Sequence, residues 1–131
     1  MIVLDASAVL ELLLATKAGR RVAERIRSPR LSLHVPHLLD LEVLQALRRY
    51  VAIGSLSLER AGMALESLVD LGLVRHEHDV LLPRIWALRE KLTAYDAAYV
   101  ALAEVLEAPL LTLDKRLASA PRHRARIELV C

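Results

Sequence analysis

Aromatic residues are scarce in this sequence. They make up 3% of the 131 residues, and phenylalanine is absent. A platform of aromatic rings for stacking single-stranded nucleic acid is therefore not expected. Hydrophobic residues nevertheless reach 55%, which supplies a folded interior and argues against a disordered chain. That interior must be built from leucine, valine, alanine and isoleucine.

Cysteine is almost absent as well, because Cys131 is the single one and stands at the end of the sequence. This excludes a disulfide framework and a thiolate metal site, and no structured base can be assigned beside Cys131 to make it a nucleophile. Apolar runs of ~20 residues, which a membrane span needs, are missing. Asp5 interrupts any signal-peptide pattern at the N-terminus. We therefore expect a soluble protein of the cytoplasm.

Neither sign of charge dominates the sequence. The 18 basic residues stand against 16 acidic ones, for a formal net charge of +2. Arginine, whose planar fork suits phosphate oxygens, supplies 15 of the basic residues. This composition permits a polyanionic partner without requiring one. The length suits a single domain that spans residues 1–131.

Short apolar runs alternate with helical patterns along the chain. Strands are predicted at 2–4, 31–35, 73–77, 110–112 and 127–130. Helices are predicted at 8–14, 17–26, 37–53, 58–71, 80–92 and 97–107. This alternation predicts an α/β fold in which helices cover both faces of a mainly parallel sheet.

Two aspartates follow predicted strands. Asp5 closes the strand at 2–4, and Asp114 comes soon after the strand at 110–112. Parallel strands end at one edge of their sheet, and ligands of such sheets gather beyond that edge. We therefore expect both carboxylates there.

Two further acids are expected near the same edge. Asp96 opens the helix at 97–107, with Thr93 in the position of an N-cap, and such helices commonly begin at that edge. Glu42 borders the apolar side of the helix at 37–53. Carboxylates that converge repel one another unless a cation lies among them, and Mg²⁺ takes oxygen ligands of this kind.

Each acid also has a structural interpretation. An aspartate in such a position can cap the turn or helix that follows, which stabilises a helix by about 0.5–2 kcal/mol. Glu42 can pair with a nearby arginine such as Arg48. Taken together, the four acids favour a metal site, in which the hydroxyls of Ser7 and Thr112 would orient a carboxylate or a water molecule.

Four segments resemble the motifs of PIN-domain nucleases, in order and over essentially the whole chain. They are residues 2–10 around Asp5, 36–48 around Glu42, 92–103 around Asp96 and 111–117 around Asp114. Within that family the chain is most similar to the VapC toxins of bacterial and archaeal toxin–antitoxin pairs. The resemblance implies a three-layer α/β/α sandwich and an endoribonuclease that depends on Mg²⁺ or Mn²⁺. It also implies a homodimer and inhibition by a VapB-type antitoxin.

The resemblance assigns roles to the four acids. Asp5, Asp96 and Asp114 would hold the ion directly or through water. Glu42 would complete the shell of ligands or take a proton from the attacking water. The products would carry a 5′-phosphate and a 3′-hydroxyl.

The residues after the fourth acid depart from part of the family. Some members carry a further acid there, whereas this chain has Lys115, Arg116 and Leu117. This difference favours one metal ion over two. Lys115 and Arg116 would instead hold the phosphate backbone of the substrate, which by family analogy is a structured RNA such as transfer RNA.

Three other interpretations stay open. The run His76-Glu77-His78 places two histidines on one face of a strand, but it lacks the spacing of a zinc motif and a third ligand. Asp5 could be a phosphorylated nucleophile, although Ser7 stands where such sites want a second acid. The domain could also bind RNA or a protein without cutting it. The presence of all four acids favours an enzyme.

Overall fold

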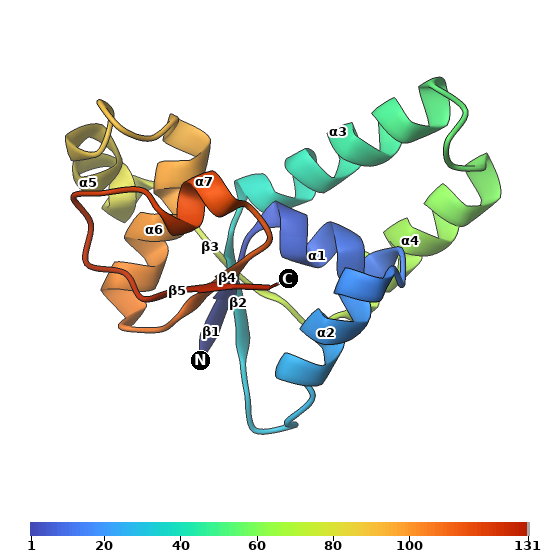
Figure 1. Ribbon diagram of the computed structural model, residues 1–131, viewed down its shortest axis with the longest axis horizontal. Helices are drawn as coiled ribbons and strands as arrows, with labels where there is room; N and C mark the ends of the chain where they lie inside the picture. The colour runs from blue at the N-terminus through green and yellow to red at the C-terminus, as the bar shows by residue number, and fades with distance from the viewer. Residues whose placement is uncertain (131) are drawn as a thin grey trace.

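The computed structural model describes residues 1–130, in which five strands form one sheet with every neighbouring pair parallel (Figure 1). The strands are β1 (Ile2–Leu4), β2 (Leu33–Pro36), β3 (Val74–His76), β4 (Leu110–Thr112) and β5 (Ile127–Leu129). Their order, β3-β2-β1-β4-β5, puts β1 in the middle, between β2 and β4. The predicted parallel sheet is confirmed. The interpretation of Cys131 lies outside the described residues.

Helices lie on both sides of this sheet. They are α1 (Ala6–Leu13), α2 (Lys17–Arg25), α3 (Leu38–Ala52), α4 (Leu58–Asp70), α5 (Leu82–Ala87), α6 (Ala94–Leu106) and α7 (Lys115–Ala118). Figure 1 shows α5 and α6 on one side of the strands and α1 and α2 on the other, while α3 and α4 extend away from the sheet. Helix α6 contacts β1, β2 and β4, and α1 contacts β4. The three-layer α/β/α arrangement is therefore confirmed.

The core is aliphatic, as the composition predicts, with one exception. The three residues of β1 have no exposed surface, and α6 buries every residue from Ala97 to Ala103. Four of these seven are alanines, whose small side chains let the helix lie close against the sheet. The exception is Tyr99, an aromatic ring that is 2% exposed. Its hydroxyl must find a partner at the rim of the core, because an unpaired buried hydroxyl is costly.

Helices α1 and α2 approach each other closely at Gly19. A Cβ atom at this position would lie 1.9 Å from the carbonyl oxygen of Glu11, which is backbone and has little freedom to move. Thr16 caps α2 by accepting a hydrogen bond from the N–H of Gly19 over 3.0 Å. The absence of a side chain at Gly19 thus sets how tightly this helical pair can fold.

Several element boundaries differ from the predictions, and the short helix α7 was not predicted. The helix predicted at 80–92 is wrong in extent, because the chain forms a 3-10 turn at Asp79–Leu81 and then the short helix α5. By leaving the helix after Ala87 the chain buries both Leu88 and Leu92 in the core. Helix α6 begins at Ala94, three residues earlier than predicted, since Thr93 caps its first turn. Within residues 1–130, no helix combines the length and apolar character that a membrane crossing requires.

Candidate functional site

The carboxyl ends of β1 and β4 lie side by side in the centre of the sheet. Leu4 pairs with Leu111, and the N–H of Asp5 donates to the carbonyl of Leu111 over 3.2 Å. Asp5 is the N-cap of α1, and Asp114 is the N-cap of α7. Strand pairing thus brings together two aspartates that are more than a hundred residues apart in the sequence.

Asp5 is held by three donors and is almost fully buried. The hydroxyl of Ser7 donates to Oδ1 over 2.6 Å, and the N–H of Ala8 donates to the same oxygen over 3.0 Å. The hydroxyl of Thr112 donates to Oδ2. Burial raises the pKa of Asp5 above its ordinary value, while these hydrogen bonds act in the opposite direction. The donors fix the direction in which each carboxylate oxygen points.

The two hydroxyls also connect Asp5 to the loop after β4. Ser7 accepts a hydrogen bond from the N–H of Leu113 over 3.0 Å, and Thr112 accepts one from the N–H of Asp114 over 3.0 Å. Thr112 has no exposed surface. Each hydroxyl therefore donates to Asp5 while it accepts from the backbone that leads to Asp114, which couples the positions of the two acids.

Asp96 reaches this edge from the first turn of α6. Thr93 accepts a hydrogen bond from the N–H of Asp96 over 3.1 Å. The side chain of Asp96 is partly buried, and its pKa is raised first by this burial and then by the negative charge of Asp114. The Thr93 hydroxyl and the positive charge of Arg116 act in the opposite direction. The charges of Asp96 and Asp114 are thus close enough to repel each other.

Glu42 comes from α3 and lies against the same acids. Its pKa is raised first by burial and then by the charges of Asp96 and Asp5. The Tyr99 hydroxyl donates to Oε1 of Glu42 over 2.6 Å. Burial and the neighbouring carboxylates also raise the pKa of Tyr99, so this hydroxyl keeps its proton and acts as a donor.

Tyr99 was given no role by the sequence reasoning. A signal was present, because Tyr99 stands three residues after Asp96 and so shares one side of the helix with it. In a chain with an aliphatic core, a tyrosine beside a predicted site acid calls for a hydrogen-bond partner. Its partner, Glu42, is remote in sequence, and only the packing of α6 against the rest of the fold identifies it.

The chemistry of these side chains fits a hydrated divalent cation. They are hard oxygen donors whose negative charges raise the pKa of one another. Within residues 1–130, no three His, Cys, Asp or Glu side chains converge closely enough to hold an ion by direct contacts alone. Mg²⁺ suits this spacing, because it keeps several water molecules and needs one or two carboxylates in direct contact.

Comparison with known proteins agrees with this geometry. The PIN domain family matches residues 2–123. The protein named Ribonuclease VapC12 of Mycobacterium tuberculosis is 42% identical over 130 residues, which cover 99% of each chain. Ribonuclease VapC1 of the same organism is 44% identical over 129 residues, or 98% of this chain and 96% of that one.

The chain belongs to the VapC ribonucleases of the PIN-domain family. The predicted family resemblance is thereby confirmed. A solved structure of a toxin–antitoxin complex from Klebsiella pneumoniae contains a chain that matches this VapC-type fold with a TM-score of 0.65 and 19% identity. The match covers 91% of both chains and supports the fold.

In this VapC-type domain, hydrogen bonds of His34, His76 and His78 join β2 to β3 and the start of α3 to the segment after β3. Nδ1 of His34 lies 2.8 Å from Nε2 of His76, and the other nitrogen of His34 lies 2.8 Å from the Ser32 hydroxyl. His78 accepts a hydrogen bond from the N–H of Leu38 over 3.2 Å. These bonds give His76 and His78 a structural role.

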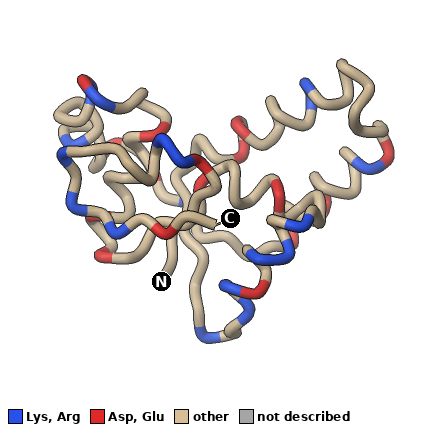
Figure 2. Tube along the Cα trace, in the orientation of Figure 1, with Lys and Arg blue, Asp and Glu red and all other residues tan. Residues whose placement is uncertain are grey.

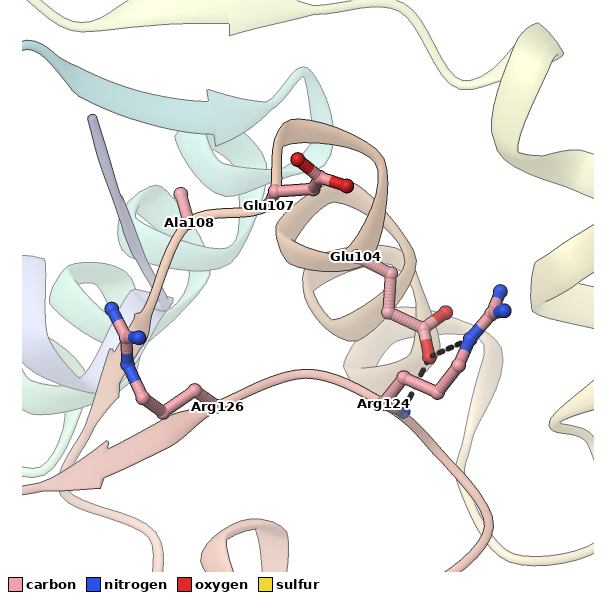
Figure 3. Close-up of a pocket in the computed structure, with 5 residues that line it drawn as sticks. All are labelled: Glu104, Glu107, Ala108, Arg124 and Arg126. Carbon is pink, nitrogen blue, oxygen red and sulfur yellow. Dashed lines mark hydrogen bonds and ion pairs between the residues drawn. The ribbon is translucent and has the colours of Figure 1, made fainter.

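A cavity lies at the end of α6 that is remote from Asp96. It has a volume of about 380 Å³ and is lined by charged side chains that include Glu104 and Arg124 (Figure 3). Glu104 accepts two hydrogen bonds from the guanidinium of Arg84, over 2.7 and 3.0 Å, and one from the N–H of Arg124 over 2.7 Å. These contacts satisfy Glu104, and the bond from Arg124 holds the loop before β5 against α6.

The basic residues predicted to hold RNA stand beside the acids. Lys115 and Arg116 begin α7, directly after Asp114, and both are exposed. Figure 2 shows a basic stretch of chain next to an acidic one at the place of α7. The N–H of Arg116 donates to Oδ1 of Asp114 over 2.9 Å, and its guanidinium lies 3.8 Å from the same oxygen. Both side chains thus reach solvent next to the carboxylates, and that of Arg116 is paired with Asp114.

Proposed function

We propose that this chain is an endoribonuclease that depends on Mg²⁺ or Mn²⁺ and acts as the toxin of a toxin–antitoxin pair. The observation that carries the proposal is that Glu42 lies close enough to Asp96 and Asp5 for their charges to raise its pKa. The VapC relatives, which are named ribonucleases and match almost the whole chain, supply the substrate class.

Asp5, Asp96 and Asp114 are the residues that would hold the ion, with Glu42 as the fourth. When bound, a divalent ion stabilises charge on the phosphoryl group and makes water a better nucleophile. Asp5 contributes an orientation that is set before the ion binds, since Ser7 and Thr112 fix both of its oxygens. This pre-set geometry lowers the reorganisation needed during the reaction.

Glu42 is suited to accept the proton of the attacking water. Its Oε1 is occupied by the hydrogen bond from Tyr99, which leaves Oε2 to take the proton. The water oxygen forms a bond to phosphorus, the bond from phosphorus to the 3′-oxygen breaks, and that oxygen takes a proton from solvent. The products carry a 5′-phosphate and a 3′-hydroxyl. A raised pKa favours Glu42 as a base, because catalytic bases work best when their pKa approaches the working pH.

Lys115 and Arg116 would hold the phosphate backbone of the RNA beside the site. Their position directly after Asp114 and their exposure support this role. Contacts of this kind orient a strand without reading its sequence. By family analogy we propose a structured RNA, such as transfer RNA, as the substrate.

We also propose a VapB-type antitoxin as inhibitor, a homodimer as the working form, and a location in the cytoplasm. Large apolar side chains exposed on α3 and α4 support a protein partner. They include Leu44, Leu58, Met63 and Val69. The single-domain organisation over residues 1–131 stays a prediction, which the matched span of the PIN family favours.

Cleavage of total RNA by the purified chain tests the proposal. We expect fragments with 5′-phosphate ends in Mg²⁺ or Mn²⁺ and none in EDTA. Asp96→Asn keeps the shape of the side chain and removes its charge, so it should abolish the cut. Cleavage by Asp96→Asn at the parent rate would contradict the mechanism. Binding of RNA without cleavage in Mn²⁺ would favour a binding module.

A further inference from the structure

A cavity of about 420 Å³ opens beside the acid cluster and has one of the four acids, Glu42, in its wall. Three elements enclose it: Ala6 at the start of α1, one side of α3, and Tyr95 at the start of α6. Glu42 belongs both to the acid cluster and to the wall of this cavity. A part of the substrate that bound in this cavity would therefore lie next to the carboxylates.

The wall of the cavity combines an apolar surface with an exposed aromatic ring. Tyr95 is 64% exposed and Leu41 is 71% exposed. Both line the cavity, and Tyr95 directly precedes Asp96 in the sequence. Exposed apolar side chains next to a charged site are unfavourable in water and are better explained if a ligand covers them.

Two polar side chains of α3, Gln45 and Arg49, continue the wall of the cavity beyond Leu41. Leu41, Gln45 and Arg49 follow each other at intervals of four residues, so α3 presents them on the same side. The Gln45 amide offers both a donor and an acceptor. Within residues 1–130, Arg49 forms no ion pair with an acid, and its guanidinium lies 5.7 Å from the centre of the Tyr50 ring.

We propose that this cavity is a subsite for one unpaired base of the RNA strand that is cut. The proposal rests on the ribonuclease function proposed above. The base would stack on Tyr95, present its edge to the amide of Gln45, and place an adjoining phosphate near the guanidinium of Arg49. Proteins read single-stranded RNA in this way, by splaying a base onto an aromatic ring and pairing its edge with side chains.

The single aromatic ring and the charge of the wall both favour one nucleotide in this cavity. One ring suffices for one base, so the scarcity of aromatic residues, which argues against a row of stacking rings, is no obstacle. The positive charge of Arg49 complements the negative phosphates of RNA, while the negative charge in the wall, Glu42, belongs to the acid cluster. Selection of a base in this cavity would let the enzyme choose where along a strand it cuts.

Abasic scanning of a short RNA tests the subsite. The probe is a fluorescent single-stranded RNA of about 12 nucleotides, within the range that such sites cover. Affinity is measured by anisotropy in EDTA, which prevents cleavage. In the wild type, removing the base at one position should weaken binding about tenfold. Tyr95→Ala should weaken binding of the intact RNA by the same factor. This variant should bind the abasic RNA and the intact RNA with equal affinity.

Two matched variants separate stacking from general damage. Tyr95→Phe keeps the ring and should bind within about twofold of the wild type. Trp86→Ala removes another exposed aromatic ring, outside the cavity, and should leave abasic sensitivity unchanged. If abasic positions weaken binding equally in the wild type and in Tyr95→Ala, the base subsite is wrong, and the cavity then serves a protein segment.

Cleavage of the intact RNA in Mn²⁺ is measured in parallel. Base-dependent binding through Tyr95 without cleavage would support the subsite and contradict the proposed nuclease. If the RNA is cleaved and the abasic position weakens binding equally in the wild type and in Tyr95→Ala, the nuclease is supported and the subsite is overturned.

Discussion

The hydroxyl of Tyr99 donates a hydrogen bond to Oε1 of Glu42 over 2.6 Å and so joins α6 to α3 at the rim of the core. Tyr99 is 2% exposed, whereas Glu42 is half-buried and faces the other acids. The bond stabilises the charged form of Glu42 and so opposes the rise in its pKa that burial, Asp96 and Asp5 cause. It also leaves a single oxygen of Glu42 open to a ligand. Tyr99 is thus a positioning residue for Glu42.

Tyr99→Phe should slow RNA cleavage without unfolding the domain. The variant keeps the ring in the core but leaves Glu42 free to rotate. A hydrogen bond to a charged group contributes about 1.5–3 kcal/mol, so we expect a fall in kcat of about tenfold or more. Steady-state cleavage rates and thermal unfolding curves measure the two effects. Tyr50→Phe, on α3, is the control and should match the wild type. An unchanged kcat for Tyr99→Phe would refute the positioning role.

A divalent ion should stabilise the wild type and fail to stabilise Asp96→Asn. At an ion concentration of about 100 times the Kd, binding to the folded state alone contributes about 2.7 kcal/mol. The Tm in Mn²⁺ and in EDTA measures this effect. Asp70→Asn changes an exposed aspartate at the end of α4 and should respond to Mn²⁺ like the wild type. Equal responses of Asp96→Asn and Asp70→Asn would place the ion elsewhere.

The stability of the metal-free protein should depend on pH through the acid cluster. Burial and neighbouring charge raise the folded-state pKa of Asp5, Glu42 and Asp96 above the values of the unfolded chain. The folded state therefore binds more protons in the window between the two values, and its stability falls as pH rises through that window. Above the folded-state pKa values this loss is complete.

Urea unfolding of wild type and Asp96→Asn in EDTA isolates this contribution. Groups outside the acid cluster titrate equally in both proteins, so their effects cancel in the difference. Glu42 adds to the difference, because the variant relieves it of the charge of Asp96. Below about pH 3, where most carboxyl groups are protonated in both states, the difference should be at its baseline. It should then grow in favour of Asp96→Asn as pH rises to neutrality. A difference that stays constant with pH would show that Asp96 is not repelled by its neighbours.

Gly19→Ala should destabilise the fold, because the new Cβ would lie 1.9 Å from the carbonyl oxygen of Glu11. Relief of such a clash requires a backbone shift, which costs about 1–3 kcal/mol. Gly62→Ala is the matched control in another helix, where a Cβ meets nothing within 4 Å. It should instead stabilise α4 by up to about 1 kcal/mol, since alanine is the better helix former. Urea unfolding midpoints of the two variants should therefore move in opposite directions.

Local sequence carried the prediction of the sheet and of its acidic edge. Asp5 and Asp114 follow short buried strands, and parallel pairing alone brings such residues together. Thr93 caps the helix that carries Asp96 through contacts within one turn. Neighbours along the chain suffice for these features, so they can be predicted without the fold.

Other features needed the tertiary structure. The predicted helix at 80–92 has the apolar content of a helix, yet the chain leaves it after Ala87 to bury Leu88 and Leu92. Packing against the rest of the core outweighs helix propensity there, since propensities differ by less than about 1 kcal/mol per residue. The cavity beside Tyr95 likewise combines α1, α3 and α6, which no local pattern places together.

The sequence by itself determined which acids meet at the edge of the sheet, because the hydrophobic runs before Asp5 and Asp114 specify where two parallel strands end. The sequence also predicted that the hydroxyls of Ser7 and Thr112 would orient a carboxylate. Only the tertiary structure decided that this carboxylate is Asp5 and that Tyr99 holds Glu42. The hydroxyls of Thr112 and Tyr99 reach Asp5 and Glu42 across more than fifty residues of chain. Contacts at such separation depend on how whole helices and strands pack, which is a property of the assembled core.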